Sequence, residues 1–491
     1  MRFSQPVRTA ELPLVPSMQI DHTTTETQPE PRKRGPRVAL ITPYDGGNLG
    51  DAAIQDSMIS NLRLRLPDAQ FLGITLNGDH FIKQHGATSA FPLLAARMPP
   101  GNGARNSASQ ANPVEYRATA PDPPRPRARN PVKRALWSLP GLVPFLKKVR
   151  LWMRTVRGEI AHSYQGYRVL RTQDVLLVSG GGQLDEEYGG PWRLPFTIFK
   201  WTLLARLAGV PCAMASIGAG KVTSATSRRL VSMAVRMCSY RSFREKKSRG
   251  IVASLFPRAM NDSVVPDLAF SMPESNLPTG LGAIRTMARG RPVVAVSPIA
   301  YGKPVNWPTP DRALHDRYVQ QLAETLRCLS RLGYFTVVVC SSLGDDESVI
   351  PEILEHLDEE TRHHLEGQIH FPAIKTWREL ATVLRDTDYL IASRLHGTIL
   401  GFLTRTPVIA ISFDPKVDWV MEDLCQTDYL LHIRDFTAED VLDALSRVKV
   451  GRDAAVEQIG AYRREILSSS ASARQYDFLA GLALKHYQSH P

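Results

Sequence analysis

The sequence predicts an α/β protein built from two Rossmann-like, doubly wound domains that face each other across a cleft. Apolar runs typical of buried strands alternate with amphipathic helical patterns through most of the 491 residues. A Pro- and Gly-spaced segment at 272–291 interrupts this alternation, which then starts again. Alternating strands and helices form parallel sheets that are covered on both faces. Ligands of such folds bind beyond the carboxyl ends of the strands, so the chemistry is expected in the loops that follow strands.

The first domain is expected at 38–280, after a disordered tail at 1–37 that is rich in Pro, Thr and Glu. Its expected strands are 37–42, 71–76, 174–179, 212–217, 239–243 and 264–265. Its expected helices are 193–207, 223–238 and one whose apolar face runs from Ile54 to Leu66.

The second domain is expected at 281–435, with C-terminal helices at 436–491. Its expected strands are 293–297, 335–341, 389–392 and 408–413. The expected helices are 312–332, 347–365, 376–385 and 398–403, followed by a helical pattern over 438–486.

The net charge of +12 is concentrated in one segment. Residues 97–157 hold thirteen basic and two acidic residues, a net charge of +11, so the rest of the chain is close to neutral. Within the expected basic insertion at 98–158, residues 98–132 are Pro- and Arg-rich and predict disorder, whereas 145–157 has the pattern of a basic amphipathic helix.

Two interpretations of this helix stay open. It could dock on its own domain with solvated charges, or it could lie on an anionic membrane surface, with Lys133, Arg134 and Trp137 extending the pattern. Nucleic acid is not an expected partner, because the segment has few aromatic residues and no recognised nucleic-acid-binding motif.

Cysteine usage and hydropathy indicate a cytoplasmic protein, with peripheral attachment to the inner face of the cell membrane as an alternative. The five cysteines form no C-x-x-C pair, which fits reduced thiols. No apolar stretch is long enough for a transmembrane helix, and the N-terminus lacks the apolar core of a signal peptide. No zinc, EF-hand or H-E-x-x-H pattern occurs, so neither a metal nor a cofactor is expected.

Two glycine-rich loops follow strands of the first domain. The loop at 46–51 opens a helix whose N-terminus favours an anion, although a plain strand-to-helix turn capped by Asp51 fits the same pattern. Three consecutive glycines at 180–182 allow the backbone to bend closely around a ligand or the other domain. The candidate contacts in these loops are Asn48, Gly50, Asp51, Gly181 and Gly182.

The candidate cations also follow strands. Arg394 and His396 lie between a buried strand and a helix, where Arg can bind an oxyanion and His can move a proton near neutral pH. Lys416 could add a charge to the same cleft. Arg244 could clamp a carboxylate or phosphate, or could form a surface ion pair.

Taken in order, these segments resemble the polysaccharide pyruvyl transferase family over roughly 38–430, without the insertion. The matching stretches are Asn48-Leu49-Gly50-Asp51, Gly180-Gly181-Gly182, Arg244-Glu245 with Ser248, Pro266-Asp267, Ser393-Arg394-Leu395-His396-Gly397 and Asp414-Pro415-Lys416. Two features depart from the family pattern: Glu245 stands where Asp is more frequent, and the long basic insertion is not expected in most members.

The resemblance implies a GT-B-like fold and transfer of pyruvate from phosphoenolpyruvate to two hydroxyls of a sugar, with release of phosphate. The acceptor would belong to an exopolysaccharide or a cell-surface glycan, lipid-linked or not. His396, Arg394 and Asp51 would be catalytic, with Asp185 as a second candidate for the base. Two alternatives stay open: a GT-B glycosyltransferase that uses a nucleotide-sugar, and a non-catalytic protein that binds a membrane.

Overall fold

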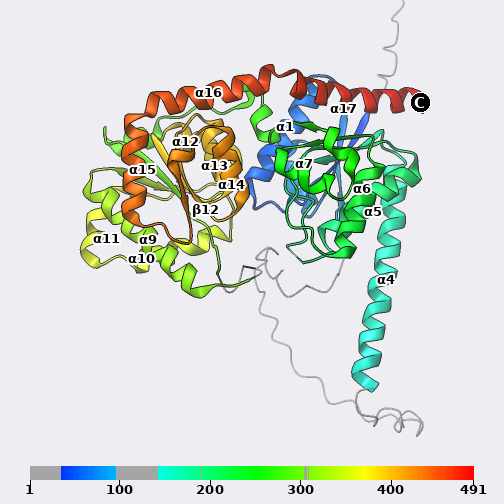
Figure 1. Cartoon of the computed structure of the whole chain (residues 1–491), viewed down its shortest axis with the longest axis horizontal. Coiled ribbons are helices and arrows are strands. Elements are labelled where there is room, and N and C mark those ends of the chain that lie inside the picture. Colours follow the sequence, from blue (N-terminus) through cyan, green and yellow to red (C-terminus); the bar gives the residue numbers. More distant parts are fainter. Residues whose placement is uncertain (1–34, 96–141, 188, 304–306, 308, 491) are drawn as a thin grey trace, which may run out of the picture. The chain divides into compact units, whose positions relative to one another are not determined.

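The computed structural model describes residues 35–95, 142–187, 189–303, 307 and 309–490 (Figure 1). Most of the tail expected at 1–37 lies outside the described residues. The irregular segment expected at 98–132 lies outside them too, as do Lys133, Arg134 and Trp137.

The first domain is built on a seven-stranded parallel sheet with the strand order β3-β2-β1-β4-β5-β6-β7. The strands are β1 Arg37–Ile41, β2 Gln70–Thr75, β3 Ser89–Pro92, β4 Val175–Ser179, β5 Cys212–Ile217, β6 Tyr240–Phe243 and β7 Ser263–Val264. The central strands are buried along their whole length, as their unbroken apolar runs predict.

The second domain is built on a six-stranded parallel sheet with the order β10-β9-β8-β11-β12-β13. The strands are β8 Val293–Ser297, β9 Phe335–Val338, β10 Ile369–His370, β11 Tyr389–Ala392, β12 Val408–Ser412 and β13 Leu430–His432. Two parallel sheets with intervening helices confirm the predicted pair of Rossmann-like domains.

The helices follow the strands along the chain (Figure 1). Those of the first domain are α1 Leu49–Arg63, α2 Gly78–His85, α4 Leu142–Leu170, α5 Leu194–Ala208, α6 Ala225–Met237 and α7 Lys246–Ala253. Those that follow are α8 Ala283–Ala288, α9 Arg312–Arg331, α10 Ile350–Glu355, α11 Glu359–Leu365, α12 Trp377–Arg385, α13 Leu395–Leu403, α14 Pro415–Asp423, α15 Ala438–Val450, α16 Arg452–Ser468 and α17 Ser470–Ser489.

Two helix predictions were wrong in their extent, those at 347–365 and 398–403. The helix expected at 347–365 is broken into a 3-10 turn at Asp346–Val349, α10 and α11, because Asp358 caps a new helix through the N–H of Thr361. The C-terminal helices expected at 436–491 are α15, α16 and α17. The last break lies at Ser469, whose hydroxyl caps α17. The helix expected at 398–403 already begins at Leu395.

The basic amphipathic helix is α4, and it is much longer than the 145–157 predicted. Its C-terminal half packs against α5, with His162, Gly166 and Leu170 buried. Farther toward its N-terminus, Trp152 is 66% exposed. The part of α4 that docks on the domain thus lies beyond the predicted segment at 145–157, and the described residues of that segment present apolar side chains such as Trp152 to solvent.

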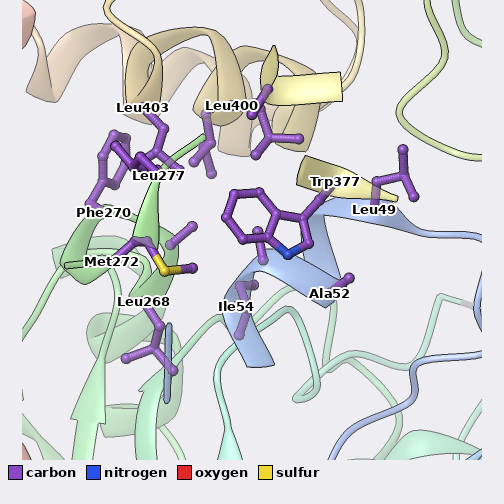
Figure 2. Packing of buried hydrophobic residues seen from close by; sticks show 14 of the residues in the cluster. Leu49, Ala52, Ile54, Leu268, Phe270, Met272, Leu277, Trp377, Leu400 and Leu403 are labelled. Carbon is purple, nitrogen blue, oxygen red and sulfur yellow. The ribbon is translucent and has the colours of Figure 1, made fainter. Parts of the chain in front are cut away.

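One hydrophobic cluster joins the two domains (Figure 2). Ala52 and Ile54 of α1 lie beside the indole of Trp377, which belongs to α12 of the second domain. The segment at 272–291, expected to be a linker, contributes buried residues to the same cluster, among them Met272 and Leu277. Helix α1 is thus held from both domains, which fixes the loop that precedes it.

The last helix returns to the first domain. Helix α17 packs on α1, β1 and β4, although the preceding α15 packs on α9 of the second domain. Among the described residues, no helix is both long and apolar enough to cross a membrane.

Candidate active site

A cavity of about 310 Å³ lies where the carboxyl ends of the two sheets meet. Loops from both sheets line it. In the first sheet they follow the neighbouring strands β1 and β4, and in the second they follow the neighbouring strands β8 and β11. Both pairs mark the point where the strand order of a sheet reverses, the usual ligand site of this architecture. The cavity is lined by Thr42, Pro43, Asn48, Asp51, Gln55, Ser179, Gly180, Gly181, Gly182, Gln183, Ala300, Trp307, Asp345, Arg394 and His396.

His396 is oriented by the first domain. Its Nδ1 atom lies 3.0 Å from Oδ1 of Asn48. The same oxygen caps α1 by accepting hydrogen bonds from the N–H groups of Gly50 and Asp51, at 3.1 and 3.3 Å. Because this oxygen acts as an acceptor, Nδ1 must carry a hydrogen, which makes Nε2 the nitrogen without a hydrogen in the neutral imidazole. Nε2 is buried and has no hydrogen-bond partner among the described residues.

Gly50 provides the space that the imidazole occupies. A Cβ atom at this position would lie 2.0 Å from Cγ of His396, far inside contact distance. The glycine expected to touch a ligand therefore has a different role in the structure: it lets the second domain insert His396 against the start of α1.

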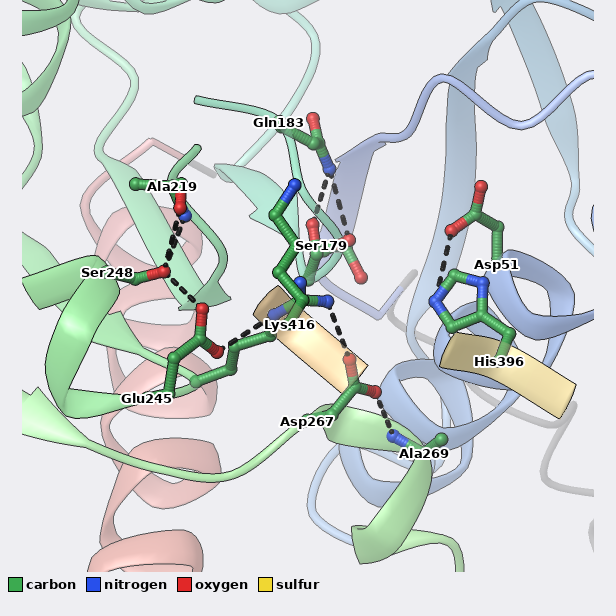
Figure 3. A network of polar contacts seen from close by, with 12 residues as sticks. Asp51, Ser179, Gln183, Ala219, Glu245, Ser248, Asp267, Ala269, His396 and Lys416 are labelled. Carbon is green, nitrogen blue, oxygen red and sulfur yellow. Dashed lines mark hydrogen bonds and ion pairs between the residues drawn. The ribbon is translucent and has the colours of Figure 1, made fainter. Parts of the chain in front are cut away.

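Asp51 lies on the other side of the imidazole, with Oδ1 3.9 Å from Nε2 of His396 (Figure 3). Burial raises the pKa of the Asp51 carboxyl, and the imidazole of His396 partly opposes this rise. The nearby carboxylate of Asp267 raises the pKa further. This ion pair places a carboxyl group beside a ring nitrogen that has no hydrogen bond within the described part of the chain, and both residues line the cavity.

Arg394 lines the cavity and is held by a buried carboxylate. Its Nε and Nη2 atoms donate to the two oxygens of Asp346, at 2.5 and 2.8 Å. Asp346 is fully buried and also accepts from the N–H of Ala300 at 3.2 Å. Burial raises the pKa of the Asp346 carboxyl, and the guanidinium of Arg394 opposes the rise. The bidentate contact fixes the plane of the guanidinium at the cavity edge.

Backbone hydrogen bonds join the two domains beside the site. The N–H of Leu49 donates to the carbonyl of Ser341 at 3.0 Å, and the N–H of Leu343 donates to the carbonyl of Gly47 at 2.9 Å. The glycine-rich loop before α1 is therefore bound directly to the loop after β9, which positions Asn48 against His396.

The glycines after β4 form part of the cavity wall, as expected for Gly181 and Gly182. Gly181 has a φ of 72°, a conformation in which side chains are strained. Lys416 reaches this wall from the second domain. Its Nζ lies 3.3 Å from the carboxylate of Asp185 and 3.5 Å from that of Asp414.

Arg244 lies behind the wall, and it is not among the residues that line the cavity. Its Nε donates to Glu245 at 2.9 Å and its Nη1 to Asp267 at 3.3 Å. A Cβ atom on Gly218 would lie 2.7 Å from Nε of Arg244, so that glycine provides the space for the guanidinium. The structure thus shows a buried ion-pair network at this position instead of the surface ion pair that was one alternative.

Several residues of the site were not predicted from the sequence. Gln55, Trp307, Asp345 and Asp346 stand in a helix interior or in loops without a recognisable motif. Trp307 and the two aspartates follow β8 and β9, so the rule that ligands bind after parallel strands could have indicated them. In the part of the chain that the structure describes, no group of three or more His, Cys, Asp and Glu side chains is arranged to hold a metal ion.

Solved structures with the same fold have little sequence identity to this chain. A UDP-N-acetylglucosamine 2-epimerase matches with a TM-score of 0.54 and 9% identity, over 93% of this chain and 97% of that one. The S. aureus MnaA–UDP structure matches with a TM-score of 0.51 and 10% identity, over 92% and 97%. These likenesses concern the fold alone. No curated protein sequence matches the chain significantly.

A family model described as polysaccharide pyruvyl transferase matches residues 48–415. The match starts at Asn48, which holds the imidazole of His396, and ends one residue before Lys416. Apart from Thr42 and Pro43, it includes every residue that lines the cavity. The chain therefore belongs to the polysaccharide pyruvyl transferase family.

Proposed function

We propose that this transferase takes pyruvate from phosphoenolpyruvate and attaches it as a ketal to two hydroxyls of a sugar in an exopolysaccharide or a cell-surface glycan. The observation that carries the proposal is that one cavity is lined both by Arg394 and by His396, whose Nε2 has no hydrogen-bond partner among the described residues. The guanidinium of Arg394 can bind an anionic donor, and the imidazole of His396 can transfer a proton.

The donor carries a carboxylate and a phosphate. Arg394, its plane fixed by Asp346, supports the binding of one of these groups. The backbone at Gly181 and Gly182, which lines the same cavity, supplies further N–H groups for the donor. Lys416 stands next to this wall and adds positive charge. Arg244, paired with two carboxylates, would act through the backbone at Gly218, whose N–H donates to Gly181.

His396 acts as the general acid in this proposal. When protonated at Nε2, it delivers a proton to the methylene carbon of the donor, which becomes a methyl group. The carbon that bears the phosphate turns into an oxocarbenium-like centre, to which the first sugar hydroxyl adds. Phosphate then leaves and the second hydroxyl adds. The two sugar hydroxyls release two protons. One replaces the proton that His396 gave to the methyl group, and the other is taken up by the leaving phosphate.

Asp51 is the proposed base for the attacking hydroxyl. It shares the cavity wall with His396, and burial raises the pKa of its carboxyl, which makes the carboxylate a stronger base. Asp185 is bound to Lys416, which makes it the weaker candidate. The scheme requires neither a metal nor an organic cofactor.

Ketal formation by His396→Ala and Arg394→Ala tests the site. We expect each variant to stay folded and to lose at least about 100-fold in turnover. His363→Ala, at an exposed histidine of α11, is the matched control and should turn over normally. Wild-type turnover in both site variants would reject the assignment.

Thermal unfolding distinguishes the donor classes. Phosphoenolpyruvate should raise the melting temperature of the wild-type protein, and UDP-sugars should not. The reverse result would favour a nucleotide-sugar glycosyltransferase. Mass spectrometry of the pyruvate content of the cell's exported polysaccharide, with and without this protein, tests the product.

The projecting part of α4 is proposed to hold the enzyme at the cytoplasmic face of an anionic membrane, where lipid-linked acceptors are assembled. Met153 and Ile160 share one side of the helix and are 47% and 64% exposed. Arg150, Arg154 and Arg157 are exposed beside them. Apolar side chains flanked by arginines are typical of helices that lie in a lipid interface.

Co-sedimentation with vesicles tests this attachment. The full chain should sediment with phosphatidylglycerol vesicles at low salt and stay in solution with phosphatidylcholine vesicles. Replacing all three arginines by Gln should abolish sedimentation without changing turnover on a soluble acceptor. No sedimentation of the wild-type chain at low salt would refute the attachment.

A further inference from the structure

Three buried side chains in the first-domain wall of the cavity lack partners for their oxygen atoms. Gln55, Ser179 and Gln183 all line the cavity, and each is 1% exposed. Within the described residues, Oε1 of Gln55, Oγ of Ser179 and Oε1 of Gln183 have no hydrogen-bond partner. Buried polar atoms are normally paired, so three unpaired ones in one cavity wall indicate a ligand that pairs them.

The two amides are oriented so that they present acceptors. Nε2 of Gln55 donates to the carbonyl of Ser179 at 3.2 Å. Nε2 of Gln183 donates to the carbonyls of Gly180 and Ser179, at 2.8 and 3.2 Å (Figure 3). Because carbonyls can only accept, the nitrogens must face them, and the amide oxygens are left for the ligand.

These three oxygens do not suit phosphoenolpyruvate. The oxygens of an ionised phosphate and carboxylate are acceptors, and acceptors repel acceptors. Sugar hydroxyls donate, and each can satisfy one of the three oxygens. The cavity therefore offers two kinds of partner: Arg394 and backbone N–H groups suit the anionic donor, and the three oxygens that lack a partner among the described residues suit hydroxyls.

Trp307 supplies an apolar surface in the same cavity. Its ring packs edge-on against Tyr301 and Phe413, with ring centroids 4.7 and 5.5 Å apart. A ring held in this way offers a stable face to the apolar side of a pyranose, while a few polar groups fix the orientation of the sugar.

Taking the proposed pyruvyl transfer as its basis, we infer that Gln55, Ser179 and Gln183 form the acceptor subsite, where they bind saccharide hydroxyls, with Trp307 as the platform for the sugar ring. The subsite selects for hydroxyl-bearing rings and excludes anionic groups.

Ser179→Ala is the sharpest variant, because Oγ of Ser179 has no partner to lose among the described residues. Its melting temperature should equal that of the wild type. Ser330→Ala is the matched control, since Oγ of Ser330 is also buried and unpaired but lies in α9, away from the cavity. Trp307→Ala and Trp307→Phe form a second pair, in which Phe should restore most of the binding.

Saturation-transfer NMR with the full chain and methyl glycosides of galactose, glucose, mannose and N-acetylmannosamine, without phosphoenolpyruvate, measures the subsite. At least one glycoside should bind the wild type, and Ser179→Ala and Trp307→Ala should each weaken it about tenfold. Ser330→Ala should bind as the wild type does. If no glycoside binds the wild type, or both site variants bind normally, the inference is overturned.

Stabilisation of the protein by phosphoenolpyruvate is measured separately, as the increase in melting temperature. The melting shift that the donor causes should be the same in Ser179→Ala and in the wild type. Loss of this shift in every protein, with glycoside binding intact, would reject the proposed donor and leave the saccharide subsite standing.

Discussion

Oδ1 of Asn48 in the first domain lies 3.0 Å from Nδ1 of His396 in the second. This oxygen also caps α1, so one amide group both starts a helix and fixes the reactive tautomer of the imidazole. The proposed general acid is thus positioned only when both domains are assembled. Substitutions at three residues around this site, and at one buried carboxylate of the first domain, have predictable effects.

Asn48→Ala should separate the two roles of this residue. We expect the loss of the cap to destabilise the protein by about 1 kcal/mol. Turnover should fall by more than about tenfold, because the imidazole is no longer oriented. Asn48→Asp keeps an oxygen for both contacts and should retain most of the stability. Equal turnover in Asn48→Ala and the wild type, measured at saturating donor, would contradict the orienting role.

Gly50→Ala should displace His396, because the added methyl group would overlap the imidazole. We expect a loss of turnover of up to about 100-fold, since small displacements of a catalytic group are costly. Gly158→Ala in α4 is the control, because a Cβ there would contact nothing within 4 Å. It should keep full activity and gain about 0.5–1 kcal/mol in unfolding free energy. Normal turnover in Gly50→Ala would show that the loop adapts.

Asp346→Ala should leave the guanidinium of Arg394 without its bidentate partner. Removing one member of a buried ion pair costs about 3–5 kcal/mol, so chemical denaturation should show a clear loss of stability. Asp346→Asn retains one acceptor oxygen for Arg394, so its stability should lie between that of Asp346→Ala and that of the wild type. In both variants the KM for the donor should rise, because Arg394 is no longer held at the cavity edge. An unchanged denaturation midpoint in Asp346→Ala would refute the anchoring role.

Glu186→Gln should alter how stability depends on pH. Burial would raise the pKa of Glu186, but hydrogen bonds from the hydroxyls of Ser224, Ser227 and Thr223 outweigh it and leave the pKa well below its ordinary value of 4.5. The charged carboxylate therefore stabilises the fold above pH 4.5. This contribution is lost as the pH falls from 4.5 toward the lower pKa of the folded state.

At neutral pH we expect Glu186→Gln to be less stable than the wild type by about 2 kcal/mol. The difference between the two proteins should shrink as the pH falls below 4.5, because the unfolded wild-type chain then binds a proton at Glu186 and the folded protein does not. Unfolding curves at several pH values test this. A difference that stays constant with pH would show that the charge of Glu186 does not matter.

The local sequence determined the fold class and the places where chemistry occurs. Unbroken apolar runs such as Val175–Ser179 and Val293–Ser297 can be recognised as buried strands from the sequence. A glycine or a polar motif directly after such a run marks the carboxyl end of the strand. From this, Asn48, Asp51, Arg394 and His396 could be assigned in advance to loops at one edge of the sheets, and all four line the cavity.

The tertiary structure decided which of these residues meet and what each one does. Gly50 makes room for an imidazole that follows it by 346 positions in the chain, and Arg394 is anchored by an aspartate that has no motif around it. Helix α17 returns to the first sheet, although its sequence simply continues a helical pattern. Such contacts depend on the shapes and charges of surfaces that are distant in the chain, whereas periodicity and turn signals record only the preferences of neighbouring residues.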